Sequence, residues 1–105
     1  MITRELTIGI ANGSPRLWLE GLWLRDAGFP AGQPYQAFTN GLTLELRTVK
    51  AGESDPTVRT RVVSGKDRKG DRIPVIDINS GKVVPMTGTV SVVCAEPGRI
   101  VVTKV

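Results

Sequence analysis

Turn-forming residues recur at short intervals along this 105-residue chain and limit the length of every element between them. Asn40-Gly41 and Pro97-Gly98 each separate two short runs of apolar and β-branched residues, which is the pattern of a β-hairpin. The one expected helix is short, because Leu22 to Ala27 runs into a glycine stop at Gly28. We expect strands near residues 3–10, 34–39, 42–49, 58–64, 72–78, 89–94 and 99–104. The sequence therefore predicts an all-β fold with one short helix.

The two halves of the sequence repeat the same order of features at the same spacing. Arg16 and Gly32 are 16 residues apart, as are Arg72 and Gly88, so the halves align at an offset of 56 residues. Each half then ends in a strand, a tight turn and a strand. Such a period indicates an internal repeat, and an evenly spaced β-meander is the alternative. We expect one domain over residues 1–105, made of repeats near 1–52 and 57–105 joined by a linker near 53–56.

The composition excludes several kinds of chemistry. Because the sequence contains no histidine, Ser–His–Asp triads, Cys–His dyads and histidine-ligated metal sites are impossible. The carboxylates follow no metal-ligand spacing, and no glycine-rich phosphate loop occurs. We therefore expect no cofactor, no metal ion and no catalytic residue, although carboxylate or lysine chemistry keeps an enzyme open as an alternative.

Cysteine usage and the apolar runs bear on the compartment. The single Cys94 cannot form an internal disulfide, which is typical of a reducing compartment, and its apolar surroundings predict a buried side chain. Arg4 and Glu5 interrupt the N-terminal segment, and no apolar run approaches the roughly 18 residues of a membrane span. We expect a cytoplasmic protein that does not associate with a membrane.

The net charge of +4 is concentrated in residues 59–72, here called the basic segment, which contain six basic and two acidic side chains. Arg59 and Arg61 alternate on an expected strand and share a face, and the other basic residues are expected in the loop that follows. The candidate nucleic-acid-binding residues are Arg59, Arg61, Lys66, Arg68, Lys69 and Arg72, with Arg4 and Arg16 as first-half equivalents by position. Arginine and lysine bind phosphates, whereas a solvated loop and contact with an acidic protein are the alternatives.

The five aromatic residues are Trp18, Trp23, Phe29, Tyr35 and Phe38. We expect them in the core, with an exposed patch for a protein partner as the alternative. Because none interleaves with the basic segment, the sequence argues against stacking of single-stranded bases. Buried Trp18 and Trp23 beside an exposed basic segment would favour nucleic acid, and exposed tryptophans would favour a protein partner.

The segment from Leu22 to Pro34 (LWLRDAGFPAGQP), followed by Asn40-Gly41-Leu42-Thr43-Leu44, resembles the SymE-type toxin family. SymE-like proteins belong to the wider AbrB/MazE superfamily of swapped-hairpin barrels. In the second half, Gly70-Asp71-Arg72-Ile73-Pro74-Val75 is similar to the Gly-Arg-apolar-Ile-Pro element of AbrB itself. Because members of the superfamily carry one copy and dimerise, the resemblance implies that this chain forms an AbrB-like swapped-hairpin barrel as a single-chain pseudo-dimer.

The resemblance also implies a function. AbrB-like proteins contact DNA through the strand and loop that correspond to the basic segment, so we expect a small nucleic-acid-binding protein that prefers DNA to RNA. The implied setting is a transcription regulator or a toxin–antitoxin-like protein of a bacterium or phage, as a monomeric pseudo-dimer or a homodimer. A protein-interaction module or inhibitor that binds a nucleic-acid-handling partner is the alternative. A SymE-like RNA-cleaving toxin is the second alternative.

Overall fold

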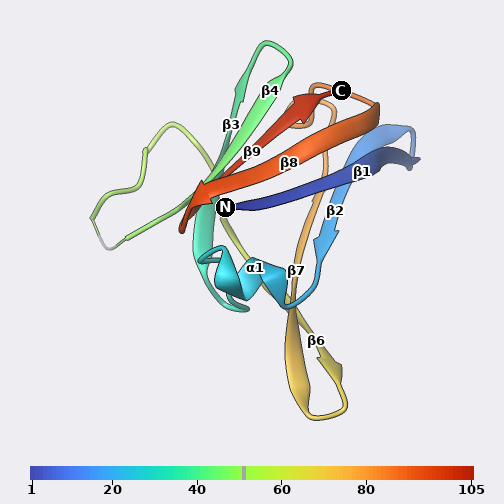
Figure 1. Ribbon diagram of the computed structural model, residues 1–105. Coiled ribbons are helices and arrows are strands. Elements are labelled where there is room, and N and C mark those ends of the chain that lie inside the picture. The colour runs from blue at the N-terminus through green and yellow to red at the C-terminus, as the bar shows by residue number, and fades with distance from the viewer. Residues whose placement is uncertain (51) are drawn as a thin grey trace.

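The computed structural model describes residues 1–50 and 52–105, and this part of the chain forms nine strands and one short helix (Figure 1). The elements are β1 (Ile2–Ala11), β2 (Ser14–Glu20), α1 (Trp23–Asp26), β3 (Pro34–Asn40), β4 (Thr43–Thr48), β5 (Thr60–Val62), β6 (Ser64–Arg68), β7 (Asp71–Asn79), β8 (Gly88–Glu96) and β9 (Arg99–Lys104). Residue 51, at the end of the first expected repeat, lies outside the described residues. None of the helical structure described is long and apolar enough to cross a membrane.

Every pair of neighbouring strands is antiparallel, and the order across the sheet is β5-β3-β4-β9-β8-β1-β2-β7-β6. The two strands at the ends of this order, β5 and β6, are separated along the chain only by Val63. The sheet therefore curls into a nearly closed barrel, and the predicted all-β class is confirmed.

The pairing scheme is unchanged when the two halves of the chain are exchanged. In this exchange β5 and β6 together correspond to β1, β7 corresponds to β2, and β8 corresponds to β3. The pairs β1–β2 and β1–β8 of one half are thus matched by β6–β7 and β5–β3 of the other. The pairs β2–β7 and β4–β9 join one half to the other. Gly9 pairs with Arg16 as Lys66 pairs with Ile73, so these two hairpins are related by a shift of 57 residues rather than the expected 56.

Two expectations about the strands are corrected. Residues 14–20 form β2, a strand that the expected ranges omit although the repeat aligns Leu17-Trp18-Leu19 with a strand of the second half. Leu17 and Leu19 point into the core, and Trp18 between them points outward. The second correction concerns Lys66, Arg68 and Arg72, which the sequence predicts in a loop. They lie on the paired strands β6 and β7, and only Lys69-Gly70 separates those strands.

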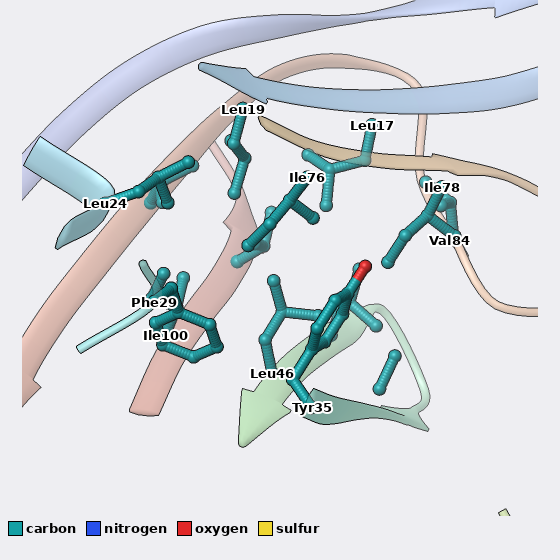
Figure 2. Close-up of a cluster of buried hydrophobic side chains, with 14 of the residues drawn as sticks. Leu17, Leu19, Leu24, Phe29, Tyr35, Leu46, Ile76, Ile78, Val84 and Ile100 are labelled. Atoms are coloured by element: carbon teal, nitrogen blue, oxygen red, sulfur yellow. The ribbon is translucent and has the colours of Figure 1, made fainter. Parts of the chain in front are cut away.

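The core lies inside the curled sheet, where alternate residues of β2, β4, β7, β8 and β9 meet (Figure 2). Phe29 and Tyr35 are buried and pack edge to face, with ring centroids 6.2 Å apart. Cys94 is also buried, as expected, and burial raises the pKa of its thiol. The expectation that all five aromatic residues are core is confirmed for Phe29 and Tyr35 alone. Trp23 and Phe38 are only half-buried, and Trp18 is 43% exposed because it alternates with the inward-facing leucines of β2.

Candidate nucleic-acid interface

The β6–β7 hairpin carries four of the six basic side chains of the basic segment, and all four are exposed. Its turn residues Lys69 and Gly70 both have positive φ, 50° and 83°, as a two-residue type I′ turn requires. This turn matches the right-handed twist of the strands, so the ladder continues to Arg68 and Asp71 at the tip. Figure 1 shows the hairpin reaching beyond the barrel, which places its charges where a large ligand can reach them.

Side-chain alternation divides this hairpin into two faces. Lys66 and Arg68 share one face, whereas Asp67 and its cross-strand neighbour Arg72 share the other. Arg72 donates from Nη1 to Oδ1 of Asp67 at 3.3 Å, and its side chain extends over Gly65. A Cβ at Gly65 would lie 2.5 Å from Cζ of Arg72, so the glycine leaves room for the guanidinium. Arg72 thus points away from the other basic residues of the hairpin.

Glu20 of β2 lies beside the face that carries Lys66 and Arg68. Its Oε1 is 3.8 Å from Nζ of Lys66, and its Oε2 is 3.7 Å from Nη2 of Arg68. The two basic side chains remain 53% and 60% exposed, and ion pairs of this kind contribute no more than about 1 kcal/mol. Glu20 therefore orients the two cations toward β2 and leaves most of their donors accessible to a ligand.

Arg4 reaches the same region from β1. Its Cζ lies 4.8 Å from the ring centroid of Trp23, a cation–π contact. The indole N–H of Trp23 donates to the backbone oxygen of Glu20 at 3.0 Å, and the ring covers Gly21, where a Cβ would lie 2.7 Å from Cδ1. A hollow of about 540 Å³ lies between α1 and the β6–β7 hairpin, and Arg4, Trp23 and Arg68 contribute to its walls.

Arg16 occupies a different part of β2. Its Nε and Nη2 donate to the two carboxylate oxygens of Asp77 at 2.9 Å each, and its Cζ lies 4.6 Å from the ring centroid of Trp18. The hydrogen bond to Asp77 raises the pKa of Arg16, which keeps the guanidinium charged. Arg16 is thus paired on the side nearest the β1–β2 hairpin, away from Lys66 and Arg68.

Arg59 lies just before β5 and Arg61 lies on it, at the end of the strand order opposite to β6. Arg61 is the cross-strand neighbour of Tyr35 in the β3–β5 pair. Burial raises the pKa of Tyr35 to about 12, and the positive charges of Arg61 and Arg59 act in the opposite direction. Among the residues that the structure describes, the large hollow is not lined by Arg59 or Arg61.

The structure therefore brings together only part of the predicted set. Arg4, Arg68 and Lys69 line one hollow. Lys66 lies next to this hollow, because it is 3.8 Å from Glu20, which also lines it. Sequence reasoning did not predict that Trp18, Trp23 and Glu20 contact cations of the predicted set. The alternation of Leu17, Trp18 and Leu19 was the available signal, because it directs the indole outward once residues 14–20 are read as a strand.

A comparison with models of protein families, with curated proteins and with solved structures finds no match to this chain. In residues 1–50 and 52–105, no three Cys, Asp or Glu side chains are grouped so that they could hold a metal ion.

Proposed function

We propose that this protein binds nucleic acid, with phosphate contacts made by the β6–β7 hairpin. One observation carries the proposal: Lys66, Arg68, Lys69 and Arg72 are all exposed on a hairpin that projects from the barrel. Exposed guanidinium and ammonium groups bind phosphate oxygens by charge-assisted hydrogen bonds, and arginine can also fork onto guanine. Release of counterions from the nucleic acid supplies much of the affinity.

The wider setting follows the resemblance to SymE-like and AbrB-like proteins. In this proposal the chain is two copies of a superfamily unit that form one swapped-hairpin barrel, acting in the cytoplasm as a regulator or a toxin–antitoxin-like protein. The strand pairing, which is unchanged when the two halves are exchanged, supports this arrangement. DNA is the preferred ligand in this setting.

A salt-titrated binding assay with duplex DNA, single-stranded DNA and RNA tests the proposal. The variant Arg68→Ala/Lys69→Ala/Arg72→Ala should bind more weakly. The negative slope of log K against log salt should become shallower by about 3, one for each phosphate that the variant no longer neutralises. The control Lys50→Ala/Lys82→Ala/Lys104→Ala removes the same charge from exposed positions elsewhere and should keep the wild-type slope. Equal binding by wild type and the hairpin variant would refute the proposal.

A protein-interaction module is the second candidate, because the 43% exposed Trp18 is a side chain typical of interface hot spots. Under this alternative the same assay would show no binding to any of the three nucleic acids at low salt. The RNA arm, run with magnesium, also tests the RNA-cleaving alternative, which requires cleavage that a carboxylate substitution such as Asp71→Ala abolishes.

A further inference from the structure

We propose that the outer face of β2 forms a groove for single-stranded nucleic acid, with unpaired bases stacked against Trp18 and Trp23. This inference rests on the proposed function and specifies the ligand of the same region. Single-stranded DNA and single-stranded RNA share the chemistry that the groove would recognise, namely a phosphate backbone and bases with free faces. The separation of aromatic and basic residues along the sequence argues against stacking, and the fold removes that separation.

The groove consists of three adjoining hollows of about 270, 320 and 540 Å³. Trp18 lines both the first and the second, and Trp23 lines both the second and the third, together with Arg4 and Glu20. The series therefore runs from the β1–β2 hairpin, past both tryptophans, to Arg68 and Lys69 on the basic hairpin. Such a row offers successive sites along a strand rather than one pocket for a small molecule.

The backbone of β1 explains why the groove is open. β1 pairs with β2 only from Gly9 to Ala11, and its earlier residues pair with β8 instead. In the described part of the chain, residues 17–20 of β2 thus have a strand partner on β7 alone. The two strands diverge at this point, and Leu6, Trp18 and Leu19 are among the residues that line the gap between them.

The two indole rings are held in place before any ligand arrives. Both hydrogen bond to Glu20: Nε1 of Trp18 donates to Oε1 at 3.3 Å, and Nε1 of Trp23 donates to the backbone oxygen at 3.0 Å. Each ring also has an arginine over it, Arg16 at 4.6 Å and Arg4 at 4.8 Å from the centroid. Bases stack on indole rings and on guanidinium planes, and a guanidinium at the rim can also bind a phosphate.

The charges fix the orientation of the strand. On the side of β2 and β7, Asp77 is paired with Arg16, so this side carries little net charge. On the hairpin, Lys66, Arg68 and Lys69 outnumber the single nearby carboxylate of Glu20 and attract phosphates. The sugar–phosphate backbone should therefore follow the hairpin, with the bases directed toward the tryptophans. A duplex cannot adopt this arrangement, because its bases are already stacked and paired.

The test compares Trp18→Ala and Trp23→Ala with wild type in binding oligonucleotides of about 16 nucleotides as single-stranded DNA, single-stranded RNA and duplex DNA. Each substitution should weaken single-strand binding by roughly 5- to 150-fold, the effect of removing one stacked base, and leave duplex binding nearly unchanged. Trp18→Phe should restore much of the affinity. Since Trp18 is exposed on the surface, Trp18→Ala should keep the fold, which thermal unfolding checks.

Phe38→Ala is the matched control, because Arg47 lies over Phe38 with Cζ 4.6 Å from the ring centroid and neither residue lines the groove described above. It should leave single-strand binding unchanged. Equal affinity for duplex and single strand, with no effect of Trp18→Ala, would overturn the groove and leave phosphate binding by the hairpin intact. Failure of the wild type to bind any of the nucleic acids would instead contradict the proposed function itself. A preference for one of the two single strands identifies which of them the groove selects.

Discussion

The β1–β2 and β6–β7 hairpins share one backbone design but differ in their chemistry. Asn12-Gly13 has φ values of 52° and 76°, and Lys69-Gly70 has 50° and 83°, so both hairpins turn through the same geometry. Residues 9–15 contain no charged side chain, whereas residues 66–72 contain four basic and two acidic ones. The backbone of such a turn therefore places few demands on the exposed side chains. Binding chemistry can therefore change at the tip without a change of scaffold.

The two hairpins also differ in how far their ladders extend. The β6–β7 ladder continues to the pair Ser64–Val75, whereas the β1–β2 ladder ends at Gly9–Arg16. At the shift of 57 residues, Val75 corresponds to Trp18, and these side chains are 6% and 43% exposed. One half thus contributes cations on a fully paired hairpin, and the other contributes an aromatic side chain beside an open strand edge.

The largest expected effect comes from replacing Lys66–Arg72 with the sequence of Gly9–Pro15. The turn geometry should be kept, but the removal of four cations should lower nucleic-acid affinity by roughly 100-fold at about 50 mM salt and reduce the magnitude of the salt slope by about 4. Salt-titrated binding and thermal unfolding measure both consequences. A chimaera that is folded and binds like wild type would show that the difference between the tips is irrelevant to binding.

The second prediction compares Val75→Ala with Trp18→Ala. Val75 is buried, so its truncation should lower the free energy of unfolding by about 2 kcal/mol, while truncation of the half-exposed Trp18 should cost under about 1 kcal/mol. Denaturant unfolding of both variants provides the measurement. A larger destabilisation by Trp18→Ala would mean that this indole serves the core, and the contrast between the two strands would fail.

Local sequence signals predict most of the strands and the hairpins, because turn residues and side-chain alternation act over a few positions. Lys69-Gly70 is a turn signal in the sequence, but the paired strands on either side of it were not predicted, since lysine is an unusual residue at the positive φ of a type I′ turn. The juxtaposition of Trp18 and Trp23 with Arg68 could not be read from the sequence. It depends on the pairing of β2 with β7, whose residues are far apart along the chain, and on the divergence of β1 from β2.

The β4–β9 seam between the halves contains a carboxylate whose protonation should affect stability. In the β4–β9 seam, hydrogen bonds from Arg47 and Arg99 lower the pKa of Glu45 to about 2. A carboxylate with a depressed pKa stabilises the fold above its ordinary pKa and loses this contribution as pH falls toward 2.

Stability should therefore decline between about pH 4.5 and pH 2 by roughly 1 kcal/mol, after allowance for the exposed arginines, and Glu45→Gln should flatten this decline. Unfolding followed across that pH range tests it, with Glu53→Gln at an exposed position as the control. An unchanged pH profile in Glu45→Gln would show that the seam does not depend on this carboxylate.

Lys69→Asn gives the smallest and most selective effect, because it makes the second turn chemically like Asn12-Gly13. Asparagine tolerates positive φ better than lysine, so the free energy of unfolding should rise by a few tenths of a kcal/mol, while the salt slope of binding falls by about 1. Asn12→Lys is the reciprocal control, which should destabilise the first turn by a similar amount. Opposite signs for stability and affinity in Lys69→Asn would mean that lysine is present for its charge, at a cost to the turn. A fall in both the free energy of unfolding and the affinity would mean instead that Lys69 stabilises the fold.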